Sequence, residues 1–428
     1  MKTSIRVPPF LALLILTLAC IIGLMPKVQA LSPPPDGAYP NFTTAEGQNA
    51  LKSLTTGIAN AGIGWYSLFA ADSGSYNTAV GAGALDLNTA DKNTAVGVAA
   101  LLLNISGTNN MANGVGALVF NNDGEGNTAT GAFALYSNTG GQFNTANGEF
   151  ALYSNTIGER NTAIGDSALY LNTEGSRNTT VGNPALLSNT TGSDNTATGA
   201  NALASNLDGI NNTAIGSQIL NSNTSGDNNV AVGFEALLNN TGDLNTTIGY
   251  RALRTNTGGD SNTAVGAGAL FVNTTGGFNI AIGDAALTNN TTGDSNIGLG
   301  TAAGSNVSTA TNVIAIGADA ANVSDTCFIG NIRGVTTGIA DAIPVLMDSN
   351  HQLGTASSLR RFKKEIKPMD KASDAVLALK PVTFHYKSGA TNTPQFGLIA
   401  EEVAEVNPDL VVRDKNGDIY TVRYDAAA

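Results

Sequence analysis

A glycine recurs at almost constant spacing through most of this 428-residue chain. The repeated unit reads Asn-Thr-Ala-x-Gly-x-x-Ala-Leu and is followed by a polar stretch rich in Asn, Thr and Gly. Of the 16 intervals between successive glycines, 14 are 17 residues long and two are 16. The glycines are Gly47, Gly64, Gly81, Gly97, Gly114, Gly131, Gly148, Gly165, Gly182, Gly199, Gly216, Gly233, Gly249, Gly266, Gly283, Gly300 and Gly317. This period indicates a repeat architecture in which each unit stacks on its neighbours.

The length of the repeat selects the kind of stack. Helical hairpin repeats need more than about thirty residues, whereas 17 residues fit one coil of a β-solenoid. We expect two short strands and two turns per coil, one strand at Asn-Thr-Ala-x-Gly and the other at Ala-Leu. The predicted fold class is therefore mainly β: a parallel β-roll or β-solenoid of about 17-residue coils, followed by a small α+β domain at the C-terminus.

Stacked coils place equivalent residues in columns about 4.8 Å apart, which gives a rod roughly 80 Å long. Columns of Asn are expected to hydrogen-bond along the stack, and the repeated leucines to form one continuous apolar row. The nearly constant alanine two before each glycine, such as Ala129, is expected to occupy a crowded interior position. The variable residue that follows it, such as Thr130 or Ile164, should face the other way.

Composition excludes several classes of function. Charged residues make up 13% and aromatics 6% of the chain, the net charge is −12, and no basic stripe follows the repeats, so we expect no nucleic-acid partner. His351 and His385 are the only histidines and there is no cysteine cluster, so neither a metal site nor a cofactor is expected. A small-molecule substrate is not expected either. The rod surface is expected to be polar; a host, matrix or glycan ligand stays open, but no residue stands out as a binder.

The N-terminus has the pattern of a secretory signal in residues 1–30. Lys2 and Arg6 precede an apolar run over residues 10–25, and small residues suited to cleavage follow at 28–30. A membrane anchor and a lipoprotein signal at Cys20 are the alternatives. Cleavage after Ala30 would leave Cys327 as the sole cysteine, which excludes an intrachain disulfide. Residues 31–42 are then a linker, and residues 43–330 the repeat region.

The composition becomes strongly charged after the repeats. Residues 331–357 predict a β connector containing a hairpin, and residues 358–428 a separate small domain. Within this domain we expect a helix over 370–378, strands over 382–386 and 395–399, a helix over 400–406, and a hairpin whose strands, 410–413 and 419–422, flank Asn416-Gly417.

The repeats resemble the head region of trimeric autotransporter adhesins of the YadA type. Those heads are left-handed parallel β-rolls whose coils carry Asn-Ser-Val-Ala-Ile-Gly; the nearest matches here are residues 279–283 and 313–317. The resemblance implies a homotrimer. Most coils here are longer, and the membrane-anchoring β-barrel of that family is not found in this sequence.

The C-terminal segment resembles the Peptidase S74 family of self-cleaving intramolecular chaperones. The family's opening motif is Ser, two variable residues, Arg, an apolar residue and Lys, which Ser358, Arg361, Phe362 and Lys363 match in order. The resemblance implies cleavage between Ser357 and Ser358, with Ser358 as nucleophile and Lys363 as base. A serine–lysine dyad needs a lysine whose pKa is lowered by burial or positive neighbours.

Two departures from the Peptidase S74 pattern matter. Leu359 stands where many members have Asp or Ser. Family domains usually continue beyond the final tyrosine into trimerising helices, so we expect a shortened domain here. The sequence thus predicts a secreted or cell-surface, trimeric, adhesin-like fibre whose C-terminal domain assists assembly and cleaves itself off. A non-cleaving adhesin or stalk with a structural cap is the main alternative, and a phage-derived fibre is another.

Overall fold

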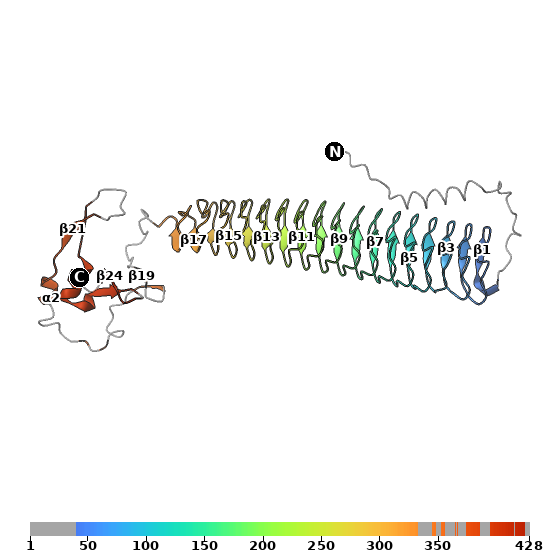
Figure 1. Ribbon diagram of the computed structural model, residues 1–428, viewed down its shortest axis with the longest axis horizontal. Helices are drawn as coiled ribbons and strands as arrows, with labels where there is room; N and C mark the ends of the chain where they lie inside the picture. The colour runs from blue at the N-terminus through green and yellow to red at the C-terminus, as the bar shows by residue number, and fades with distance from the viewer. Residues whose placement is uncertain are drawn as a thin grey trace, which may run out of the picture. The chain divides into compact units, whose positions relative to one another are not determined.

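The computed structural model describes residues 40–332, 345–347, 352–355, 364, 366, 374–385, 394–414 and 416–423. The chain divides into two compact units, Met1–Val335 and Thr336–Ala428. The described part of the first unit is a parallel β-solenoid of about 17 turns, which confirms the predicted fold class (Figure 1). Stacking of near-identical coils is the only way in which units this small can bury their apolar residues.

Each coil contributes one short strand to a single sheet of 18 strands. Every strand pairs in parallel with the equivalent strand of the next coil, so that Thr128 aligns with Thr145 and Ala129 with Ala146. A short 3-10 turn, Pro40–Phe42, precedes the first strand. The strands are β1 Thr44–Glu46, β2 Ala61–Ile63, β3 Thr78–Val80, β4 Thr94–Val96, β5 Met111–Asn113, β6 Thr128–Thr130, β7 Thr145–Asn147, β8 Thr162–Ile164, β9 Thr179–Val181, β10 Thr196–Thr198, β11 Thr213–Ile215, β12 Val230–Val232, β13 Thr246–Ile248, β14 Thr263–Val265, β15 Ile280–Ile282, β16 Ile297–Leu299, β17 Val313–Ile316 and β18 Thr326–Ile329.

The prediction of a second strand in each coil is wrong. The Ala-Leu segment forms a turn, in which Leu135 has a φ of 52°. Ala134 and Leu135 are both fully buried. Adjacent residues of an extended strand point to opposite faces, and the outer face of a coil meets solvent, so burial of both residues here requires a bent backbone. The turn nevertheless joins coils, because the Leu135 amide donates to the Ala151 carbonyl at 2.9 Å.

The interior of the solenoid holds small apolar residues, leucines and asparagines. The predicted alanine column at the centre of the strands and the predicted leucine row are both confirmed, as Ala129 and Leu135 illustrate with no exposed surface. The predicted asparagine ladders are confirmed too. The side-chain amide of Asn138 donates to the side-chain oxygen of Asn121 at 2.7 Å, and Asn155 donates to Asn138 at 2.8 Å.

The repeated glycine permits the coils to stack closely. Gly131 has a φ of +127°, a region that L-residues rarely adopt, and a Cβ there would lie 2.4 Å from the carbonyl oxygen of Gly148. The same approach recurs from coil to coil, which explains why the glycine spacing is the strongest signal in the sequence.

The second unit contains short elements close to the predicted ones. The antiparallel pair β19–β20 forms the hairpin expected in the connector, and β21–β22 and β23–β24 are antiparallel pairs as well. The expected helix over 370–378 is described only as α2. The bounds are β19 Leu346–Met347, β20 Leu353–Gly354, α2 Asp374–Leu377, β21 Val382–Phe384, β22 Gln395–Gly397, α3 Ala400–Val406, a 3-10 turn Pro408–Leu410, β23 Val411–Arg413 and β24 Ile419–Val422.

Candidate functional site

The outer face of the 18-stranded sheet is the most extensive regular surface of the solenoid. The middle residue of each strand points inward, and the residues on either side of it point outward, as the alternation of burial along β8 shows. In most strands the first outward residue is Thr and the second is Val or Ile. Ile164, Ile215 and Ile248 are 41%, 44% and 47% exposed. These outward residues of β1–β18 are called the outer sheet face below.

The outer sheet face is almost free of charge. Among the outward residues of the eighteen described strands, Glu46 in β1 is the only one with a charged side chain. Cys327 in β18 is exposed on the same side. This face is therefore mixed: its Thr column fits the expected polar surface, and its Val and Ile column adds exposed apolar groups to it. The sequence signal was present: the residue before the repeated glycine, predicted correctly to face away from the alanine column, is β-branched in most coils.

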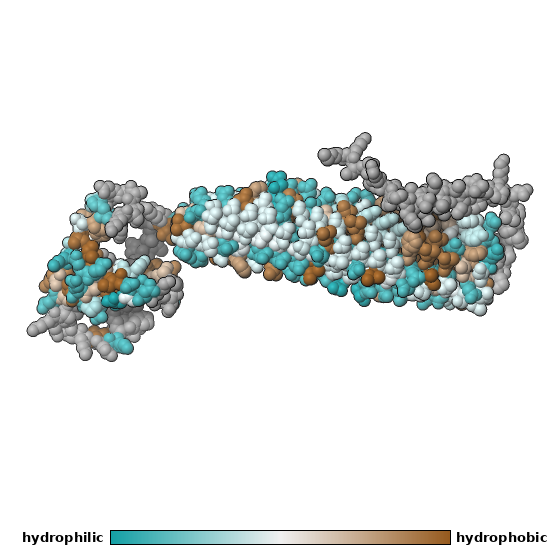
Figure 2. Space-filling model, in the orientation of Figure 1, coloured by the Kyte–Doolittle hydropathy of each residue, from teal (hydrophilic) through white to brown (hydrophobic). Residues whose placement is uncertain are grey.

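A second surface, on the turns that follow the glycines, carries stacked aromatic rings. The rings of Tyr136, Tyr153 and Tyr170 stack at centroid distances of 5.1 and 5.2 Å, and Phe133 stacks on Phe150. Burial raises the pKa of each of the three tyrosines. Figure 2 shows apolar residues gathered in separate patches on the visible face of the solenoid, the largest over β3–β5. Because the rings of Tyr136, Tyr153 and Tyr170 cover one another's faces, these three side chains act mainly as a structural stack.

A few charged groups of the solenoid form local ion pairs. The Glu235 carboxylate accepts hydrogen bonds from Arg254 and Arg251, both at 2.8 Å, and the bond from Arg254 contributes most to lowering its pKa. Arg177 binds Asp194 in two hydrogen bonds of 2.7 Å, which lower the pKa of that aspartate. Within the described residues there is no cluster of acidic, histidine and cysteine side chains suited to a metal ion, and no helix long and apolar enough to cross a membrane.

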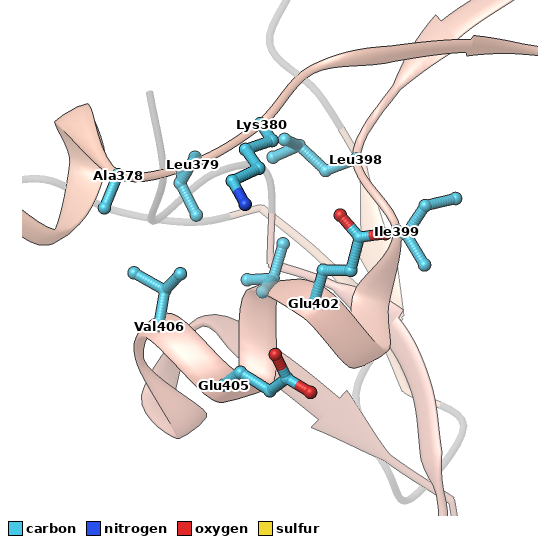
Figure 3. Close-up of a pocket in the computed structure, with 9 residues that line it drawn as sticks. Ala378, Leu379, Lys380, Leu398, Ile399, Glu402, Glu405 and Val406 are labelled. Carbon is cyan, nitrogen blue, oxygen red and sulfur yellow. The ribbon is translucent and has the colours of Figure 1, made fainter.

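The described residues of the second unit form a small core and an open pocket. Val403, Leu410, Val411 and Val422 pack together between α3 and the β23–β24 pair. Beside them lies a cavity of about 410 Å³. Figure 3 shows Lys380 and Glu402 extending into the space above its apolar floor from opposite sides. The lining residues are Ala378, Leu379, Lys380, Leu398, Ile399, Glu402, Val403, Glu405 and Val406.

The residues predicted from the sequence to carry the cleavage chemistry lie outside the described residues. These are Ser357, Ser358, Arg361, Phe362 and Lys363. His385, predicted to lie on a strand face, is exposed one residue after β21.

Comparison with known families identifies the segment that contains these residues. Residues 358–412 match the Peptidase_S74 family, described as chaperone of endosialidase. The Peptidase_S74 match includes Ser358, Arg361, Phe362 and Lys363 and runs through the pocket residues to the first residues of β23. No curated protein and no solved structure matches the chain, so the resemblance of the repeats to YadA-type heads stays a prediction. A β-solenoid followed by a Peptidase_S74 chaperone match fits a fibre-like or adhesin-like protein.

Proposed function

We propose that the chain is a secreted or cell-surface fibre that assembles as a homotrimer through its outer sheet face. In this proposal the Peptidase_S74 segment assists assembly and then cleaves the chain before Ser358. The observation that carries the proposal is the pairing of a long, nearly uncharged outer sheet face with a match to an assembly chaperone.

The outer sheet face supports the trimer on energetic grounds. Val and Ile side chains that are about two-fifths exposed, such as Val181 at 40%, occupy equivalent positions in many successive coils. Removal of apolar surface from water contributes about 25 cal/mol per Å², and exposed apolar side chains that recur along one surface favour an interaction site. In a three-fold assembly the three rods run parallel, so each coil meets its own equivalents at the same height.

A need for assistance follows from the topology of the solenoid. Its sheet is entirely parallel, and every strand pair joins residues 13 to 17 positions apart in the chain. Each coil leaves an unpaired strand edge until the next coil stacks on it, and such an edge can pair with the wrong partner. A C-terminal chaperone that aligns three chains before the coils stack would limit such errors.

The proposed cleavage is an acyl transfer followed by hydrolysis. The Ser358 hydroxyl oxygen attacks the carbonyl carbon of Ser357 while Lys363 accepts the hydroxyl proton. The peptide bond to the Ser358 nitrogen breaks as that nitrogen takes up a proton, which leaves an ester that water hydrolyses. Arg361 and Lys364, as positive neighbours, would favour the neutral form of Lys363.

The test is the mass of the products formed from residues 31–428. Expression of this segment should yield two fragments that separate between Ser357 and Ser358. Ser358→Ala and Lys363→Met should each leave the chain intact, whereas Ser357→Ala, the neighbouring serine, should still allow cleavage. Failure of Ser358→Ala to change the products would argue against the dyad.

Sedimentation of the same samples tests the assembly separately. A trimer with an intact chain would favour the alternative, a non-cleaving adhesin or stalk whose C-terminal domain is a cap. A monomeric repeat region would contradict the proposed trimer. The signal in residues 1–30 is tested by tracking whether a tagged full-length chain leaves the cell with its N-terminus removed.

A further inference from the structure

In the column of residues that precede the repeated glycines, polar residues occupy three successive strands, whereas Glu46 in β1 and Thr198 in β10 are single polar positions. From β2 to β4 the residue before the glycine is Ile63, Val80 or Val96, and from β8 onward Val and Ile predominate again. Between these stretches, β5, β6 and β7 present Asn113, Thr130 and Asn147. We call these three residues the polar interval.

The polar interval has no structural task within a single chain. The side chains of Asn113 and Asn147 are exposed, and within the described residues neither they nor the Thr130 hydroxyl has a hydrogen-bond partner. The interior asparagines of the same coils, such as Asn127, already satisfy the backbone through their own ladder. The donors and acceptors of the polar interval are therefore free to bind groups outside the chain.

An apolar row of equal steps does not fix how far along the axis one rod lies relative to another. A slip of one coil moves a rod by about 4.8 Å and replaces one β-branched contact with another. A polar layer changes this balance, because burying an amide against methyl groups without a hydrogen bond is unfavourable by about 1–3 kcal/mol. In a one-coil slip in either direction, Asn113 of one chain would face Val96 of another, and Asn147 would face Ile164.

We propose that Asn113, Thr130 and Asn147 set the axial register between copies of this chain. With all chains level, each polar side chain meets its equivalents around the three-fold axis and finds hydrogen-bond partners there. A single buried asparagine specifies the register of a coiled coil by the same principle. This inference rests on the proposed assembly through the outer sheet face, since a second copy is the one partner that repeats both the apolar steps and the polar interval.

The experiment uses interchain disulfides as a measure of register. Both chains comprise residues 31–428 and carry Cys327→Ser, which removes the native thiol. One chain also carries Val181→Cys. The other has a different tag and carries Thr198→Cys, which lies at the equivalent position one coil later. After co-expression and mild oxidation, level chains should cross-link only like with like. Disulfides between unlike positions report a slip of one coil.

Replacing the polar interval should permit slippage. Asn113→Val, Thr130→Val and Asn147→Val together should raise the unlike cross-links at least about tenfold, a change that corresponds to 1.4 kcal/mol. The matched control, Asn113→Thr with Asn147→Thr, should keep the like-only pattern because it keeps polar groups. Asn147→Val alone should give an intermediate yield of unlike cross-links. This single substitution keeps the test valid if the triple variant misfolds.

The outcomes separate the two proposals. Two results would overturn the assignment of register while leaving the trimer in place. One is that the triple valine variant still cross-links only equivalent positions. The other is that chains with an unaltered polar interval already cross-link position 181 to position 198. Absence of every interchain cross-link, together with a monomeric sedimentation coefficient, would overturn the trimer and the register with it.

Discussion

Buried asparagines fill the interior of this solenoid, a place that larger apolar residues occupy in an ordinary protein core. Asn138 has no exposed surface; it donates to Asn121 and to the Gly141 carbonyl and accepts from Asn155. A buried amide contributes to stability only when its donors and acceptors are satisfied, and stacking of identical coils satisfies them automatically. The interior is therefore selective for coils in register.

Asn138→Ala should destabilise the repeat region by about 2–4 kcal/mol, since three hydrogen bonds of about 1 kcal/mol each are lost together with buried volume. Denaturant unfolding followed by circular dichroism measures this change. Asn183→Ala is the control, because Asn183 is exposed and its hydrogen bond to Asp166 is long at 3.4 Å. Equal effects of the two substitutions would contradict the role assigned to the ladder.

The Glu235 carboxylate predicts a stability loss in acid. Its pKa is lowered below the ordinary value of 4.5 because Arg254 and Arg251 bind the ionised form. The unfolded chain therefore binds this proton more tightly than the folded chain. The stabilisation is fully present above about pH 4.5 and is lost as the pH falls through the lower folded value.

Glu235→Gln isolates this contribution. The variant should be less stable than the parent at pH 7, by about 1–3 kcal/mol, and the difference should shrink as the pH falls below 4.5. Thermal unfolding of both chains between pH 7 and pH 3 measures it. A difference that stays constant over this range would show that the pKa of Glu235 does not govern the effect.

At the scale of the element, the coil could be predicted from the sequence only in part. The glycine spacing and the asparagine columns gave the correct parallel stack, because backbone sterics and buried amides tolerate few alternatives. The Ala-Leu segment predicts a strand but forms a turn, since a two-residue apolar signal does not reveal that both side chains point inward. The outer sheet face combines the expected polar Thr column with an apolar column, whose signal in the sequence is Ile164 and its equivalents. Ser358 and Lys363 stay a prediction.

Glycine substitutions test the stacking of coils. Gly131→Ala should destabilise the solenoid by more than about 3 kcal/mol, because its φ of +127° is strained for alanine and the new Cβ would lie 2.4 Å from the Gly148 carbonyl oxygen. Gly258→Ala is the matched control: a Cβ there meets nothing within 4 Å. Unfolding midpoints of both variants decide the matter, and a mild effect of Gly131→Ala would refute the close-approach argument.

The whole solenoid behaves as a sum of coils and of the contacts between neighbours. Its length is therefore adjustable in steps of one repeat. Deletion of residues 183–199 joins Gly182 to Ala200 and keeps every column in phase. We expect this shortened chain to fold with a circular dichroism spectrum and an unfolding midpoint close to those of the parent.

Deletion of residues 183–190 is the control for the shortened solenoid. It removes about half a coil, so the remaining residues cannot close a turn and the asparagine and leucine columns fall out of phase. This variant should show a marked loss of cooperative unfolding. Equal tolerance of the two deletions would contradict the repeat as the unit of stability.

The strands of the solenoid lie across its long direction, so the hydrogen bonds between coils run along it (Figure 1). A pulling force applied to the two ends of the solenoid therefore loads these bonds one after another rather than all together. Each coil that detaches frees 17 residues and adds about 50 Å of extended chain. Such a rod would yield stepwise under tension and lengthen severalfold before it parts, which makes it a mechanical buffer between the bodies that it connects.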